Sequence, residues 1–488
     1  MLPSADVARG RAAGLDVIGE LPGTYPEWLG DQGFTAAHGL RYPYVAGEMA
    51  HGISTTGMVT ELARAGMLGF FGAAGLPLPR VEAAVTALAG ALTPDRAWGV
   101  NLIHTPREPE WEERTADLLL ARDVRRISAS AFLELTPAVV RCSAAGLRTD
   151  PAGRVVRRTH LFAKVSRPET AAAFMSPAPP ALLNALVERG RLSREEADLA
   201  ARVPVAQDIT VEGDSGGHTD NRPLVTLLPR ILALRDRIQR RHRYPEAIRV
   251  GAAGGLGTPQ SVAAAFALGA AYVVTGSVNQ TAAEAGISAE AKRMLAAADL
   301  TDVIMAPAAD MFELGVKVQV LRRGTLFGVR ARKLYDLYRG HDSLEAVPAA
   351  ERTALERDIL RASVTEVWTE AERFWNDRDP AQLRRAATDP KHRMALVFRW
   401  YLGRSSVWAV TGDPGRVLDY QLWCGPALGA FNQWTAGSWL ADPARRTVAQ
   451  IARNLLEGAT VLTRAHQLRS LGVPLPHRAF SFTPRPLA

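Results

Sequence analysis

The sequence predicts a (β/α)₈ TIM barrel with a helical insertion after its fifth strand and a helical C-terminal extension. Short apolar, β-branched runs alternate with helical stretches rich in Ala, Leu, Glu and Arg, and a glycine-rich turn follows the seventh run. Such alternation is typical of parallel βαβ units, and eight units can close a barrel. An open doubly wound sheet is the alternative. The predicted strands cover residues 44–46, 68–71, 98–102, 126–129, 161–165, 203–207, 248–251 and 272–275.

This pattern divides the chain into three segments. We expect a lead segment over residues 1–40, the barrel over residues 41–335 and a helical region over residues 336–488. Residues 170–202, inside the barrel, begin as a Pro-rich loop and continue as Arg- and Glu-rich helices, so they are a candidate lid. Seven of the ten tryptophans lie beyond residue 360, which indicates a packed core or a contact surface such as that of a homodimer.

The composition argues against several classes of function. The chain of 488 residues is 47% hydrophobic and 22% charged, without an apolar run of about 18 residues or a secretory pattern at its start. We therefore expect a globular, cytoplasmic protein. Two cysteines and no histidine pair at metal-binding spacing argue against a metal site. The net charge of +8 favours acidic partners in general, without distinguishing nucleic acid, membrane and acidic protein.

The most specific local motif is GGLGT at residues 254–258, between a predicted strand and a predicted helix. Glycines let backbone N–H groups approach a phosphate, Thr258 can cap the helix, and helix starts bind anions. The next strand ends in TGS at residues 275–277, so two strand ends can hold one phosphate. The motif matches neither a P-loop nor a GxGxxG fingerprint, and a turn without a ligand is the alternative. The predicted phosphate contacts are Gly254, Gly255, Gly257, Thr258, Gly276 and Ser277.

A histidine motif, EGDSGGH at residues 212–218, follows the sixth predicted strand. Gly216 and Gly217 permit a tight turn against a flat ring and bring His218 toward the cavity. Histidine suits proton transfer because its ordinary pKa of about 6.5 lies near working pH. A structural histidine is the alternative.

Three other predicted strand ends carry candidate site residues. Gly47, Glu48 and Met49 follow the first strand and can bring backbone close to a ring, while Asn101 ends the third strand and Lys164 lies on the fifth. Lys164 inside a barrel needs an anionic partner, because an unpaired buried ammonium is costly. Asn101 and Lys164 can equally have structural roles.

These motifs together resemble those of the nitronate monooxygenase (2-nitropropane dioxygenase-like) superfamily. Its members are FMN-binding TIM barrels and include an enoyl-ACP reductase of bacterial fatty-acid synthesis. Here Gly47, Glu48 and Met49 stand where many members have Ala-Pro-Met. Over nearly its whole length, the chain resembles the PfaD branch of this superfamily. The matching segments are EGDSGGHTDNRP (212–223), APAADMFE (306–313), GVKVQV (315–320), RWYLG (399–403) and DYQLWCGP (419–426).

PfaD-like proteins are trans-acting enoyl reductases of polyunsaturated fatty acid synthases and polyketide synthases. The resemblance implies FMN and NAD(P)H as cofactors, an enoyl thioester on an acyl carrier protein as substrate, and His218 as proton donor. It implies ring contacts from Asn101, Lys164 and Gln207, and a close approach of Gly217. Nitronate oxidation with His218 as base, and a non-catalytic role in synthase assembly, are the alternatives.

The expected partner is an acidic carrier protein, rather than nucleic acid or a membrane, and it requires a basic docking face near the barrel mouth. An ordinary solvated surface is the alternative for any single residue of such a face. The candidates are Arg322, Arg323, Arg330, Arg332 and Lys333.

Overall fold

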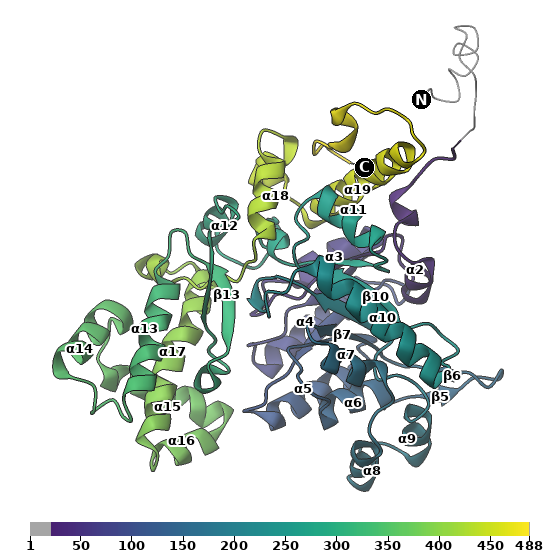
Figure 1. Cartoon of the computed structure of the whole chain (residues 1–488). Coiled ribbons are helices and arrows are strands. Elements are labelled where there is room, and N and C mark those ends of the chain that lie inside the picture. The colour runs from purple at the N-terminus through teal and green to yellow at the C-terminus, as the bar shows by residue number, and fades with distance from the viewer. Residues whose placement is uncertain (1–20, 488) are drawn as a thin grey trace, which may run out of the picture.

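A computed structural model describes residues 21–487 and shows a closed parallel barrel flanked by helices (Figure 1). The strand order is β1-β11-β10-β8-β7-β4-β3-β2, and β1 pairs with β11 to close the sheet, with Tyr44 opposite Val273. The predicted fold class is therefore confirmed. The barrel strands are β1 (Tyr44–Ala46), β2 (Leu68–Phe71), β3 (Gly99–Ile103), β4 (Arg126–Ser130), β7 (His160–Val165), β8 (Asp208–Glu212), β10 (Arg249–Ala253) and β11 (Val273–Thr275).

Seven of these strands lie within two residues of their predicted positions, but the sixth was wrongly placed. Strand β8 begins at Asp208, whereas the prediction ended at residue 207. The apolar residues before it pack beneath a helix, where Val205 and Ala206 donate their N–H groups to Ser176 and Phe174. Pro204 lacks an N–H group, which disfavours a central strand at this position.

Aromatic side chains fill the barrel at the amino ends of its strands. Phe70, Phe162 and Tyr272 are almost completely buried there, and Phe34 of helix α2 (Gln32–His38) stacks on Tyr272 with ring centroids 4.2 Å apart. Helix α2 therefore closes this end of the barrel. The predicted lead segment, residues 1–40, lies partly outside the described residues.

Helices wrap the outside of the sheet, as the alternating pattern predicts. The insertion after the fifth barrel strand contains α8 (Pro180–Glu188) and α9 (Arg194–Ala200), and both pack against α6. Within the described residues, no helix combines the length and apolar character needed to cross a bilayer. The other flanking helices are α3 (Thr56–Arg64), α4 (Leu78–Ala91), α5 (Pro109–Ala121), α6 (Pro137–Ala144), α7 (Pro168–Met175), α10 (Leu224–His242) and α11 (Pro259–Ala267).

A β-hairpin follows the last barrel strand, beyond the strands that the sequence predicted. Its strands, β12 (Val303–Pro307) and β13 (Lys317–Leu321), are antiparallel. Strand β13 also pairs with the short strand β9 (Gly217–His218), with Val318 opposite His218. The hairpin thus lies directly beside the histidine motif.

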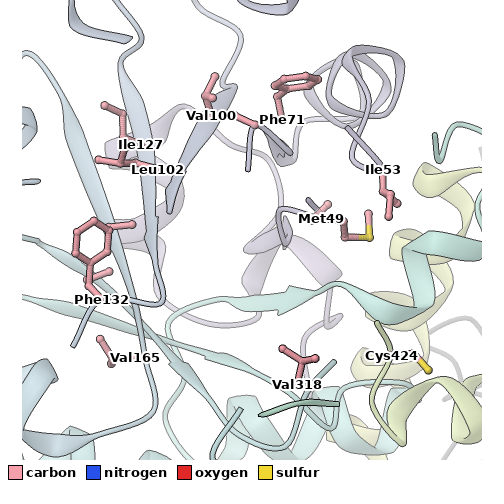
Figure 2. Close-up of a cluster of buried hydrophobic side chains, with 14 of the residues drawn as sticks. Met49, Ile53, Phe71, Val100, Leu102, Ile127, Phe132, Val165, Val318 and Cys424 are labelled. Carbon is pink, nitrogen blue, oxygen red and sulfur yellow. The ribbon is translucent and has the colours of Figure 1, made fainter. Parts of the chain in front are cut away.

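The C-terminal region is helical and shares its core with the barrel. Figure 1 shows α13 to α17 beside the barrel, while α19 packs on α11 and α3. One continuous buried cluster joins Met49 of the barrel to Val318 of the hairpin and Cys424 of the C-terminal region (Figure 2). The C-terminal helices are α13 (Phe327–Gly340), α14 (Ala349–Ala354), α15 (Val364–Arg378), α16 (Pro380–Ala386), α17 (Pro390–Thr411), α18 (Ala427–Thr435) and α19 (Val448–Ser470).

Candidate active site

A cavity of about 440 Å³ lies at the carboxyl ends of the barrel strands. This size is ordinary for a small-molecule site, and the active sites of TIM-barrel enzymes lie at this end of the barrel. The lining is not confined to the barrel, because Leu402 and Ser406 of α17, Trp423, and the hairpin residues Asp310 and Val318 also contribute. The C-terminal region and the hairpin therefore enclose the mouth. The sequence indicated a packed helical region but did not predict its place in the cavity wall.

A mostly buried lysine lies at the centre of the barrel mouth, with 17% of its side chain exposed. The Lys164 ammonium is 3.1 Å from a Glu212 carboxylate oxygen and 3.6 Å from one of Glu48, and the Ser130 hydroxyl donates to Glu48. Burial opposes the charge, but the two carboxylates outweigh it and hold the pKa of Lys164 above its usual value. Protein side chains thus supply the anionic partner that the sequence required. Glu212 was missed as a partner because the sixth strand was placed too early.

His218 lies on β9 and faces the cavity. Its Nε2 atom is 3.2 Å from Oδ1 of Asp310, and 30% of its side chain remains exposed, so a ligand can reach it. Burial disfavours the charged ring, but the carboxylate of Asp310, aided by Glu212, outweighs it and raises the pKa of His218. The protonated ring is therefore favoured at a higher pH than for an ordinary histidine.

His51, a second cavity histidine, has the opposite electrostatic setting. Its ring stacks on Trp423 with the planes 1° apart, and its Nε2 lies 3.3 Å from the Ser406 hydroxyl. Burial, with the positive charges of Arg378 and Arg80, lowers the pKa of His51 to about 4. The ring is neutral at physiological pH and forms a flat wall of the cavity. It belongs to the GEMAHG motif, which is the sequence signal that could have identified it.

The two glycine-bearing strand ends lie side by side. Strands β10 and β11 are paired, with Ala253 opposite Val274, so the segments that follow them are neighbours at the cavity. Gly254 has φ +81, and an added Cβ would lie 2.7 Å from the carbonyl carbon of Gly213, so a side chain is not accommodated there. At Gly255 and Gly276 an added Cβ would enter open space.

Two other predicted phosphate residues do not line the cavity. An added Cβ at Gly257 would lie 2.0 Å from the carbonyl oxygen of Ala427, so this glycine permits close packing of the C-terminal region. Thr258 instead caps helix α11, accepting the N–H of Ser261. The remaining predicted phosphate residues, Gly254, Gly255, Gly276 and Ser277, do line the cavity.

The predicted ring contacts are also divided. Gly47, Met49, Asn101 and Gly217 line the cavity, in addition to Glu48 and Lys164. The Asn101 side-chain oxygen accepts the N–H groups of Ala73 and Ala74, which fixes the turn after β2.

Gln207 does not reach the site. It precedes β8, at the opposite end of the strand from the cavity, and its side-chain amide donates to Glu246 at 2.6 Å. The expected ring contact is wrong because it depended on the misplaced sixth strand. Gln280, which the motifs did not reveal, lines the cavity and has a buried side-chain oxygen without a hydrogen-bond partner within the described residues.

The candidate lid does not cover the cavity. Helices α8 and α9 pack against α6, and Thr170 is the one residue of the segment 170–202 that lines the cavity. The lid prediction is therefore wrong, since the hairpin and the C-terminal region occupy the mouth.

The predicted docking cluster is only partly available. Arg330 is mostly buried against Asp419, while Arg323 and Lys333 form ion pairs with Asp302 and Glu351. Arg322 and Arg332 are exposed, and neither forms an ion pair among residues 21–487. Arg330 is thus a structural residue, which contradicts its prediction as a docking residue.

Comparison with known proteins reveals extensive similarity. A solved structure, the enoyl reductase domain of MlnA from the macrolactin biosynthesis cluster of Bacillus amyloliquefaciens, is 38% identical with a TM-score of 0.86. The match covers 90% of this chain and 99% of that chain. A family model described as the inserted helical domain of acyl-carrier-protein S-malonyltransferase matches residues 341–420.

Two curated relatives are longer proteins. A polyunsaturated fatty acid synthase subunit of Thraustochytrium sp. (strain ATCC 26185 / S-3) is 46% identical over 91% of this chain and 30% of its own length. Polyketide biosynthesis protein PksE of Bacillus subtilis (strain 168) is 43% identical over 90% of this chain and 57% of its own length. The chain therefore spans only part of each of these relatives.

The charge arrangement around Lys164 predicts a pH-dependent loss of stability. In the Lys164→Met variant, the carboxylates of Glu48 and Glu212 lie together without the cation, so binding a proton in the folded state relieves their repulsion. The folded variant then binds more protons than its unfolded chain, and stability falls as the pH rises. We expect Lys164→Met to lower the free energy of unfolding, relative to wild type, by about 3–5 kcal/mol at pH 8 and by less at pH 5.

Urea unfolding of the cofactor-free protein at both pH values measures this effect. Lys164→Arg is the control, because it keeps the positive charge and should lose less stability at pH 8. Equal destabilisation of Lys164→Met at the two pH values would contradict the prediction.

Proposed function

We propose that this protein reduces the carbon–carbon double bond of enoyl thioesters. The chain belongs to the PfaD-like family of enoyl reductases of polyunsaturated fatty acid and polyketide synthases. The observation that carries this proposal is one cavity in which His218 faces the same space as the glycine-bearing ends of β10 and β11. A proton donor and a candidate phosphate site thus share one enclosed volume.

The residues of the cavity fit FMN. Open space beside Gly255 and Gly276 leaves room for a phosphate, and the preceding strands hold both glycines at one rim. Gln280 offers a buried oxygen without a partner in the described chain, which is an acceptor of the kind that a flavin N–H group needs. The chemistry that bound FMN supplies is hydride transfer from NAD(P)H to the β-carbon of the thioester.

The side chains of the cavity divide the remaining tasks. Nε2 of His218 faces Asp310, so Nδ1 is the nitrogen left to give a proton to the α-carbon. The Lys164 ammonium holds Glu48 and Glu212 in place, and neutral His51, stacked on Trp423, adds a flat wall without charge. Trp423 and Leu402 help to exclude water from the reacting centre.

We place the carrier-protein docking face at the start of α13. Exposed apolar side chains gather here: Leu326 and Leu418, whose backbones are hydrogen-bonded, and Val329, with exposed fractions of 43%, 46% and 64%. The exposed Arg322 and Arg332 flank them, so the face combines apolar area with positive charge, as an acidic partner requires. Strand β13 leads from this face to the cavity over five residues, or roughly 13 Å.

Replacing His218 with Ala tests the catalytic assignment. We expect turnover of NADPH with a carrier-bound crotonyl group to fall about 10²- to 10⁴-fold, because the proton donor is lost. Intact mass should show a gain of two hydrogens on the enoyl carrier with the wild-type protein. His242→Ala, on the outer helix α10, is the control and should keep full activity.

The same preparations separate the alternative functions. Oxygen uptake with an alkyl nitronate, without reduction of any enoyl thioester, would favour nitronate oxidation. A colourless wild-type protein that takes up no FMN would favour a non-catalytic component. Either result would overturn the proposed reduction.

Gly255→Leu tests the phosphate site. Its side chain would occupy the open space at the rim, so we expect the purified variant to lose most of its flavin absorbance. Gly472→Leu is a matched control: Gly472 has φ +78 against +72 for Gly255, and an added Cβ at either position meets open space. The two variants carry similar backbone strain, but Gly472 does not line the cavity. Retention of full flavin content in Gly255→Leu would contradict this phosphate site.

The docking face is tested with an Arg322→Glu, Arg332→Glu double variant. We expect kcat/KM to fall about tenfold or more for carrier-bound enoyl substrate, and to stay unchanged for a small free thioester, because only the carrier meets the reversed charge. Arg237→Glu, Arg241→Glu on the exposed side of α10 is the control with the same charge change. Equal effects of the two double variants would place docking elsewhere.

A further inference from the structure

The loop between β12 and β13 brings a carboxylate to the proposed proton donor. Asp310 of this loop lines the cavity, and its Oδ1 lies 3.2 Å from Nε2 of His218. The same hairpin fixes the backbone of the histidine, because Val318 of β13 pairs with His218 of β9. Backbone and side chain of His218 are therefore both held by one element outside the barrel.

This loop is anchored on the C-terminal helical region. Phe312 is fully buried and its ring contacts Tyr335 and Tyr338 of α13 and Phe398 of α17. The next residue, Glu313, has a carboxylate oxygen 3.5 Å from Nη1 of Arg399 on α17. The position of Asp310 thus depends on α13 and α17, two helices outside the barrel. Helix α17 begins more than a hundred residues after β11, the last barrel strand.

The surroundings of His218 make Asp310 its main charged neighbour. Glu212 of β8 acts on the ring in the same direction, and Lys164 of β7 acts against it. The other charged side chains that line the cavity near β9 are Asp214, Asp220, Lys317 and Arg167. Arg167 donates two hydrogen bonds to the carboxylate of Asp220, one from Nε and one from Nη2.

We propose that Asp310 is a positioning residue for His218, which orients the imidazole through Nε2 and stabilises its protonated form. The C-terminal region, which anchors Asp310, is then part of the proton-transfer machinery as well as a cover. The destination of the proton rests on the proposed function, but the pairing of the two side chains does not.

The proton balance of the assisted step is simple. The N–H bond at Nδ1 of His218 breaks as the C–H bond at the α-carbon of the substrate forms, and the imidazole is left neutral. Nε2 keeps its proton in the hydrogen bond to Asp310. The imidazole regains a proton from water before the next turnover, while NAD(P)H is the two-electron reductant.

The sign of the pH dependence follows from the charge of the pair. Burial alone would favour the neutral ring, and Asp310 reverses this preference. A step that needs protonated His218 is fast below the pKa of the ring and slows as the pH rises through it. Removing the carboxylate lowers that pKa, so the alkaline limb of the rate profile moves to lower pH.

The experiment compares Asp310→Asn and Asp310→Glu with wild type, with Asp302→Asn as the matched control. Asp302 lies at the base of the same hairpin, and an asparagine there can still accept the N–H of Asp299. The His218 ring is titrated by NMR in the purified flavoprotein and identified by the signal that His218→Ala removes. We expect the midpoint to fall by about one pH unit or more in Asp310→Asn, and to stay unchanged in Asp302→Asn.

The kinetic readout separates positioning from general damage. For a crotonyl thioester we expect Asp310→Asn to lose about tenfold or more in kcat/KM at pH 8 and much less at pH 6, since one unit of pKa is a factor of ten. Asp310→Glu should restore most of the loss. The rate at which NADPH bleaches the flavin should be the same in all variants, because that step does not use the pair.

An unchanged His218 midpoint in Asp310→Asn would overturn the proposal, and so would a rate loss that is equal at both pH values. If Asp310→Asn does not fold, the His218 midpoint is compared between Asp310→Glu and Asp310→Ser. Equal midpoints in these two variants would overturn the proposal. The NMR titration needs no enoyl turnover. A wild-type protein without enoyl reductase activity would therefore refute the proposed function, while the titration would still test the pairing of His218 with Asp310.

Discussion

Closure of the parallel sheet is the constraint on which the rest of the molecule depends. When β1 pairs with β11, every strand has its hydrogen-bonding partners and all eight carboxyl ends meet at one rim. Residues far apart in the chain, such as Glu48, Lys164 and Glu212, are then forced into contact distance. The cost of burying their charges is offset only because closure brings both signs to the same place.

Within that rim, environment gives identical side chains different roles. His51 is mostly desolvated, stacked on Trp423 and subject to the positive charges of Arg378 and Arg80, so it is neutral, whereas His218 is held beside a carboxylate and favours its proton. The two rings line one cavity, yet their pKa values are shifted in opposite directions. Pairs of this kind are a physical basis for assigning one group to proton transfer and the other to shape.

The C-terminal region changes the barrel from an open to an enclosed site. Trp423 stacks on His51, residues of α17 line the cavity, and the loop that carries Asp310 is held by α13 and α17. Even Gly257 of the glycine-rich turn serves this contact, since its lack of a side chain admits the backbone of Ala427. Barrel and helical region therefore form one core and one site.

The sequence alone determined the features that short-range patterns encode. Seven strands, the closed barrel and the adjacency of the segments at Gly255 and Gly276 follow from apolar runs, glycines and the order of the strands. The tertiary structure decided what depends on long-range packing. Val205 and Ala206 pair with residues at the end of helix α7, so β8 begins at Asp208 and places Glu212, not Gln207, at the cavity. The hairpin pairs with β9, and Arg330 is held by Asp419 away from the surface. A residue's partners across hundreds of positions are set by how whole elements pack, and local composition carries no record of that packing.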